Sequence, residues 1–195
     1  MESAVQAAQK GAHCHHRLSR SFTVPSARSK QESWRLTPAQ VPEGKEPEMS
    51  EQNKVLARRS VEEVWNQGKL DVIDELVAEG ATFHDPNVPG GKFTGPQGYK
   101  QFVEIYRGAF PDVHLTINDQ IAEGDKVATR WTATGTHKGA LMGIAATNKP
   151  STVTGTDIGR YAEGKLVEEW VSYDMLGMLQ QLGVVPTLAP AGASA

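Results

Sequence analysis

Two aspartates in the second half of the chain have a chemistry and a position that suit proton transfer. Asp157 lies in the middle of the segment 153–161, whose residues predict a β-strand. A charged residue within a strand faces either solvent or a functional cavity, and the surrounding residues leave both open. Asp174 follows a predicted strand and begins a predicted helix, which favours the role of a helix N-cap. Asp157 is therefore the better candidate for a catalytic base.

The reaction that such a carboxylate suits is enolisation, the removal of a proton from a carbon next to a carbonyl group. Enolisation needs a base near that proton and a hydrogen-bond donor near the carbonyl oxygen. A carboxylate acts as the base when apolar surroundings raise its pKa. Asp157 meets this requirement only if its strand turns it toward an enclosed pocket.

Histidines and aromatic residues supply candidates for substrate binding. His84 precedes an Asp-Pro turn and His137 ends a predicted strand, so each lies either at a pocket rim or in a solvated turn. Large aromatic residues usually form core, yet some of them must line any cavity that the core encloses. Arg130 and Trp131 are neighbours on one strand, so one of the two faces the concave side. The predicted substrate-binding residues are His84, Tyr99, Tyr106, Phe110, Trp131, His137 and Tyr173.

Motifs for several other chemistries are missing from the sequence. It has no glycine-rich phosphate loop and no G-x-S-x-G motif, and its one cysteine, Cys14, precedes the predicted domain. The histidines from Met49 onward are scattered and form no zinc ligand set. The His13-Cys14-His15-His16 cluster has ligand residue types but no second cluster at zinc-site spacing. We therefore expect neither a metal ion nor a cofactor.

Composition narrows the partners and the compartment. The chain has 195 residues and a formal net charge of −3. Residues 1–48 hold seven basic and five acidic residues, so the remainder is more acidic than the whole, which makes nucleic acid an unexpected partner. No run approaches the roughly 20 apolar residues that cross a bilayer, so we expect no membrane segment. One cysteine allows no intrachain disulfide, which fits the cytoplasm.

The two ends of the chain differ in character from its centre. Residues 1–48 are rich in Ser, Gln, Arg and Pro, show no helical or strand period, and are predicted to be a tail without a fold of its own. This tail is an organelle transit peptide, translated sequence upstream of a start at Met49, or an expression or interaction extension. Residues 49–185 form the predicted domain, and residues 186–195 a flexible C-terminal tail.

Helices precede strands in the predicted domain. Apolar spacing predicts a helix from Ser50, its cap, to the Asn66-Gln67-Gly68 stop, a short helix that ends at Gly80, and a third over 99–110. Alternation then predicts strands, followed by a final helix from Asp174. This order indicates an α+β fold, in which a long curved antiparallel sheet with helices on its concave side makes a cone with a pocket. The predicted strands are 81–85, 113–121, 126–137, 153–161 and 166–173.

Four short motifs occur in an order and spacing that resemble a known family. They are Arg107-Gly108-Ala109-Phe110-Pro111-Asp112, Ile121-Ala122-Glu123-Gly124-Asp125-Lys126-Val127, Thr134-Gly135-Thr136-His137 and Asp174…Gly177…Gln180-Gln181-Leu182-Gly183. Together they resemble the SnoaL-like polyketide cyclase, or ester cyclase, family within the nuclear transport factor 2-like superfamily. The resemblance covers about residues 53–185 and implies a cone formed by a curved antiparallel sheet on three N-terminal helices, with a ligand-sized pocket.

The resemblance also implies a reaction and a site. Polyketide cyclases of this type close a ring by intramolecular aldol condensation on a small organic substrate, without metal or cofactor. Their catalytic aspartate matches Val171 of this chain, and a pocket histidine matches Asp157. The chain thus lacks an acid where those enzymes carry it, and the match of Asp157 favours its facing the cavity as the catalytic residue.

Three functions remain open at the level of sequence. The first is acid–base chemistry of the cyclase, lyase or isomerase type on a small, largely apolar, carbonyl-bearing substrate. The second is a non-catalytic small-ligand-binding module of the same fold. The third is epoxide hydrolysis or isomerisation, and hydrolysis would need more pocket carboxylates than Asp157 alone. A homodimer is also expected, because an open sheet must cover its outer face.

Overall fold

A computed structural model describes residues 46–187 of the chain. The predicted tails, residues 1–48 and 186–195, lie almost entirely outside these residues. The exceptions are Glu46–Glu48, which already belong to the first helix, and Pro186 and Thr187, which follow the last helix. Within the described part, no helix is long and apolar enough to cross a membrane.

The first helix begins earlier than the sequence predicts. Helix α1 spans Glu46–Arg59 and continues directly into η2, a π-helical stretch over Ser60–Asn66. Ser50 lies within α1 and is not its N-cap; its hydroxyl donates to the Gly124 carbonyl oxygen at 3.4 Å. The helix ends as predicted, because Gly68 has a φ of +74°, a left-handed conformation that glycine adopts without strain.

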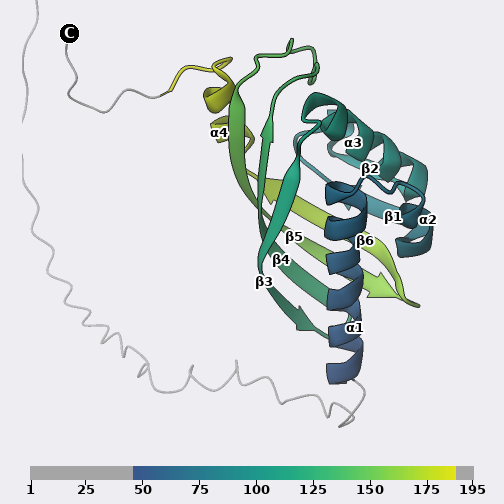
Figure 1. Ribbon diagram of the computed structural model, residues 1–195. Helices are drawn as coiled ribbons and strands as arrows, with labels where there is room; N and C mark the ends of the chain where they lie inside the picture. Colours follow the sequence, from purple (N-terminus) through teal and green to yellow (C-terminus); the bar gives the residue numbers. More distant parts are fainter. Residues whose placement is uncertain (1–45, 188–195) are drawn as a thin grey trace, which may run out of the picture. The chain divides into compact units, whose positions relative to one another are not determined.

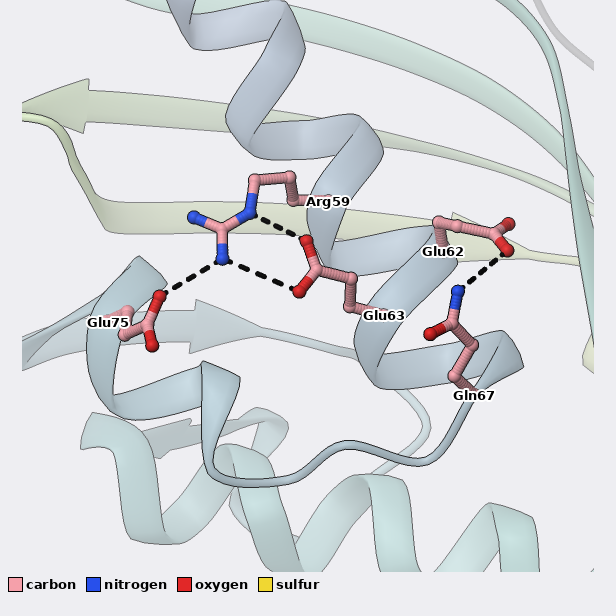
Figure 2. Close-up of polar contacts among 5 residues, drawn as sticks. All are labelled: Arg59, Glu62, Glu63, Gln67 and Glu75. Carbon is pink, nitrogen blue, oxygen red and sulfur yellow. Dashed lines mark hydrogen bonds and ion pairs between the residues drawn. The ribbon is translucent and has the colours of Figure 1, made fainter.

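Charged side chains fasten this helix to the short helix that follows it. The Arg59 guanidinium binds the Glu63 carboxylate at 2.7 Å and the Glu75 carboxylate at 3.0 Å, as Figure 2 shows. In the same view Gln67 donates to the Glu62 carboxylate at 3.0 Å and closes the end of η2. These side chains are largely exposed to solvent. Their contacts therefore orient α2 relative to η2 and add little to the free energy of unfolding.

The second helix is shorter and the first strand longer than predicted. Helix α2 covers only Val72–Leu76, and strand β1 runs from Val77 to His84, so Gly80 lies inside a strand and stops no helix. Pairing explains the difference, because Val77 already stands opposite Leu166 in the sheet. A helix of one or two turns is only marginally stable, so residues at its end pair with a neighbouring strand where one is available. A short 3₁₀ turn, η3 (Pro89–Gly91), strand β2 (Lys92–Thr94) and helix α3 (Gly95–Ala109) follow.

The remaining strands form the predicted antiparallel meander. They are β3 (His114–Glu123), β4 (Lys126–Thr136), β5 (Pro150–Ala162) and β6 (Lys165–Tyr173). The six strands lie in the order β2-β1-β6-β5-β4-β3, and all pairs are antiparallel except β1 with β6. The sheet curves and does not close, and α1, η2 and α3 cover its concave side (Figure 1). This arrangement confirms the predicted α+β cone.

Two groups of buried side chains stabilise the fold. The larger lies between the helices and the sheet and includes Val64, Phe83, Val103 and Val127. The smaller packs around helix α4 (Met175–Leu182), whose Met178 and Leu182 are buried against β5 and the end of α3. Asp174 caps this helix as predicted, since its carboxylate accepts the Gly177 N–H at 2.7 Å.

Candidate active site

The concave side of the sheet holds a cavity. The empty space in it, counted out into its open mouth, is about 1270 Å³. Side chains from α1, η2, α3 and the inner faces of β4, β5 and β6 form its walls, and most of them are apolar or aromatic. No lysine, arginine or histidine of the described residues lines it.

Asp157 faces this cavity from the middle of β5. It stands opposite Thr129 of β4 and Val171 of β6, and all three line the cavity. The inner face of β5 carries glycines on both sides of it, Gly155 and Gly159. Sheet parity thus turns the predicted carboxylate inward.

Aromatic rings occupy the space that these two glycines leave. The Trp131 indole lies directly over Gly155, and the Tyr161 ring lies over Gly159, where an added Cβ would meet it at 3.0 Å. Both aromatic residues line the cavity. Asp157 therefore stands between two rings that only glycine neighbours allow to pack so closely.

Glu169 is a second cavity carboxyl that our sequence analysis missed. It lies on β6 opposite Gly159, two residues before Val171 on the same face. Its neighbour Glu168 faces outward and pairs with Arg160 at 2.9 Å. The sequence did carry a signal for it. Successive side chains of a strand point to opposite faces, so one of the two consecutive glutamates had to face the concave side.

Burial raises the pKa of both carboxyl groups. Loss of water raises the pKa of Asp157 to about 7, against opposing effects of Trp131 and Thr129, whose polar groups favour the charged form. Burial also raises the pKa of Glu169 well above its ordinary range, and the negative charge of Asp157 raises it further. Both side chains line the cavity and are partly buried. Both acids in this apolar cavity therefore hold a proton more tightly than exposed carboxyl groups do, and Asp157 titrates in the range that acid–base chemistry uses.

Predicted residues form a second polar region, farther along β6. The Tyr106 and Tyr173 hydroxyl groups lie 2.6 Å apart, and the Tyr173 hydroxyl donates to the fully buried Asp85 carboxylate at 3.4 Å. Along the strand, Tyr173 lies about 7 Å from Asp157, which stands opposite Val171, and about 13 Å from Glu169 on the same face of β6. Val171 lies between Glu169 and Tyr173.

Two further aromatic residues that the sequence predicted for substrate binding line the cavity in different ways. Tyr99 is buried beneath the acid pair, and its hydroxyl accepts the Trp65 indole N–H at 2.9 Å and lies 3.1 Å from the Ser60 hydroxyl. Phe110 is also buried and forms part of the wall near α4. The structure thus brings Asp157 together with Tyr99, Tyr106, Phe110, Trp131 and Tyr173.

The two predicted histidines lie outside the cavity. His84 is on the outer face of the sheet, where its Nε2 is 3.0 Å from the Glu168 carboxylate and its ring stacks on Trp170. His137 is fully buried behind Phe110, and its Nδ1 accepts the Thr147 N–H at 3.3 Å. This placement corrects their predicted position at the pocket, because strand register turns His84 outward and the loop after β4 covers His137.

Comparisons with known proteins agree with this geometry. Residues 55–182 match the family described as SnoaL-like polyketide cyclase. The aklanonic acid methyl ester cyclase DnrD of Streptomyces peucetius is 29% identical over 134 residues, which are 66% of this chain and 88% of that protein. DauD of Streptomyces sp. (strain C5), an enzyme of the same name, gives the same identity over 80% of its length.

Solved structures extend the comparison. IdmH from Streptomyces antibioticus is 32% identical and aligns with a TM-score of 0.60 over 68% of this chain and 99% of its own. AclR from Streptomyces galilaeus is 27% identical, with a TM-score of 0.63 over 72% of this chain and 86% of its own. Both the fold and the sequence match along almost the whole described domain. The chain belongs to the SnoaL-like polyketide cyclase family and is an enzyme of the cyclase type.

Proposed function

We propose that this enzyme closes a ring in a small carbonyl-bearing, largely apolar substrate by an intramolecular aldol reaction, with Asp157 as the base. The observation that carries this proposal is the position of Asp157 on an enclosed apolar wall without a cation beside it. Such a wall raises the pKa of the carboxyl, which makes its charged form a stronger base.

The steps follow from this placement. The Asp157 carboxylate takes a proton from the carbon next to a carbonyl group, which leaves an enolate. The enolate carbon then forms a bond to a second carbonyl carbon of the same molecule, whose oxygen becomes an alkoxide. That oxygen takes a proton and the ring carries a new hydroxyl group. The polar groups of Trp131 and Thr129 favour the charged form of Asp157 and so keep the base ionised before it takes the proton.

The names of the relatives and the spacing of the polar groups support a polyketide ester as the substrate class. Two relatives are named for cyclising aklanonic acid methyl ester. In this chain about 13 Å of strand separates Glu169 from Tyr173, with Asp157 at a level between them, so a substrate that touches both Glu169 and the Tyr106–Tyr173 pair is longer than one six-membered ring. We propose that Tyr99, Tyr106, Phe110, Trp131 and Tyr173 bind this substrate.

The experiment compares wild type with Asp157→Asn on a panel of β-keto esters, polyketide methyl esters and epoxides. Loss of the base lowers kcat by on the order of 100-fold or more, while KM changes little. Asp119→Asn is the matched control, because Asp119 pairs with Arg130 at 2.6 Å outside the cavity lining and has no part in the proposed reaction. Equal turnover by wild type and Asp157→Asn removes the proposed base, and binding without turnover indicates a binding module.

A specific observation favours epoxide hydrolysis as the second candidate. Our sequence analysis found too few pocket carboxylates for it, and Glu169 supplies another. One ionised carboxyl can take a proton from water while its protonated neighbour donates to the opening epoxide oxygen. Turnover of the epoxides and none of the esters would select this reaction.

We also propose that two copies pair through the outer face of the sheet. Four outward side chains in register form an apolar stripe across β3 to β6, namely Ile121, Ala128, Ile158 and Trp170. Ile121 is 71% exposed, and such a stripe is self-complementary in a two-fold dimer. Ile158→Glu should halve the mass measured by light scattering, and Thr116→Glu, on β3 away from the stripe, should not.

The cytoplasm remains the proposed compartment. Its support is the single cysteine, Cys14, which leaves no internal disulfide for an oxidising compartment to form. Fractionation of cells that express the tagged full-length chain tests this proposal.

A further inference from the structure

We propose that Glu169 is a second catalytic residue, and that Glu169 and Asp157 share one proton as an acid–base pair. This inference rests on the cyclisation proposed above and adds the group that protonates the new hydroxyl. Neither the match to cyclases nor the sequence pattern assigns Glu169 a role.

The sheet register brings the two side chains together. Asp157 stands opposite Val171, and Gly159 stands opposite Glu169, so the two acids are diagonal neighbours on the inner faces of β5 and β6. Such residues have Cβ atoms about 7–8 Å apart or somewhat less, a distance that an Asp and a Glu side chain can span. Gly159 itself contributes no side chain beside the pair, and the Tyr161 ring and Leu166 pack over it.

Among residues 46–187, no cation lies beside the pair to balance two negative charges. The titratable groups that face it are Tyr99 from α3 and Tyr161 from β5, both buried and both neutral at physiological pH. The remaining walls near the pair, from α1, η2 and β4, contribute apolar or uncharged residues. Two carboxylates without a cation in an apolar cavity repel each other and lack hydration, so one proton stays on the pair.

The pair is asymmetric, which assigns the two roles. Trp131 and Thr129 favour the charged form of Asp157, whereas burial and the Asp157 charge both favour the protonated form of Glu169. Asp157 therefore starts as the carboxylate and Glu169 as the acid. This assignment matches the base already proposed and leaves Glu169 with a proton to give.

The proton balance of the reaction then closes inside the cavity. Asp157 receives the proton from the substrate carbon, and the carbon–carbon bond forms as the second C=O bond opens. Glu169 donates its proton to the alkoxide oxygen and becomes a carboxylate. One proton then passes from Asp157 to Glu169, and the pair returns to its starting state without solvent.

Glu169 also accounts for the missing acid on β6. The resemblance to cyclases places a catalytic aspartate at the position of Val171. Glu169 precedes that position by two residues, so it faces the same cavity, and its longer side chain extends its reach. The chain thus keeps an acid on this strand, one step farther from the Tyr106–Tyr173 pair.

The first test needs no substrate. We would titrate the full-length chain, with ¹³C-labelled Asp and Glu carboxyls, by NMR in wild type, Glu169→Gln and Asp157→Asn. Glu169→Gln should remove one protonated carboxyl at pH 7, and Asp157→Asn should lower the pKa of Glu169. Glu168→Gln is the matched control on the outer face and should leave that protonated signal unchanged. The proposal is overturned if Glu169 is ionised at pH 7 in wild type, or if the pKa of Glu169 is the same in wild type and Asp157→Asn.

The second test separates this proposal from the proposed function. Glu169→Gln should lower kcat about 100-fold with KM unchanged, and it should remove the alkaline limb of a bell-shaped pH profile while the acid limb persists. If Asp157→Asn loses turnover and Glu169→Gln keeps wild-type kcat and both limbs, the shared-proton pair fails and the base stands. If both variants turn over normally, both proposals fail.

Discussion

Single glycines on β5 decide how Asp157 is held. A Cβ at Gly155 would lie well inside contact distance of the Trp131 ring, so Gly155→Ala must displace the indole. We expect the free energy of unfolding to fall by about 1–3 kcal/mol and kcat to fall, because Trp131 no longer favours the Asp157 carboxylate. The acid limb of the pH profile should move to higher pH. Gly80→Ala on β1 is the control, since its Cβ meets nothing within 4 Å; equal profiles for both variants would contradict this account.

The Tyr106 hydroxyl belongs to binding and not to proton transfer. It lies 2.6 Å from the Tyr173 hydroxyl, which donates to Asp85 and to neither cavity acid. Tyr173 is about 7 Å of strand from Asp157 and about 13 Å from Glu169. Tyr106→Phe should therefore raise KM several-fold and leave kcat and its pH profile close to wild type. Leu70→Val, away from the cavity lining, serves as the control for small packing effects in steady-state kinetics. A fall in kcat with unchanged KM would instead place the reacting carbonyl at Tyr106.

How far the site could be predicted from sequence also differs residue by residue. Strand parity with the family resemblance identified Asp157, and the aromatic residues of α3 follow helical spacing into the cavity. Parity could equally have selected Glu169 from the Glu168-Glu169 pair. His84 could not be placed, because its side depends on the pairing of β1 with β6, which are more than 80 residues apart.

At the scale of elements, two of the predicted caps and stops, Asp174 and Gly68, were correct, and two, Ser50 and Gly80, were wrong. Asp174 and Gly68 were placed correctly because each acts through its immediate neighbours. The start of α1 and the extension of β1 back to Val77 were not, because strand pairing and helix packing act at long range. The short strand β2 was also missed. Its three residues are too few to show an alternating pattern, and only its pairing with β1 makes it a strand.

The N-cap of α4 allows a test of that element. Asp174→Ala removes the acceptor of the Gly177 N–H, so we expect about 1 kcal/mol less stability in urea unfolding. Asp174→Asn keeps a capping oxygen and should lose less than half of that. Because Met178 and Leu182 bury the helix against β5 and the end of α3, the midpoint should shift with the slope unchanged. No shift in Asp174→Ala would mean that packing alone holds α4.

At the scale of the whole molecule, the two buried acids make the free energy of unfolding depend on pH. Asp157 has a folded-state pKa of about 7 against an ordinary value of 3.8, so the native state binds more protons than the unfolded chain between these values. Its stabilising contribution is complete below pH 4 and is lost as pH rises through 7. Glu169, whose pKa is also raised, extends the loss to higher pH.

Wild type should therefore lose a few kcal/mol of unfolding free energy between pH 5 and 8, since a tenfold difference in proton affinity between the folded and unfolded states is worth about 1.4 kcal/mol. The double variant Asp157→Asn/Glu169→Gln should show a flat profile and exceed wild type at pH 8. Asp119→Asn/Glu168→Gln, which changes two carboxyls outside the cavity, should keep the wild-type slope, because the pKa of Glu168 is lowered and already lies below this range. Parallel profiles for wild type and the cavity variant would mean that water enters far enough to hydrate both carboxylates, and a cavity that wet could not raise either pKa for catalysis.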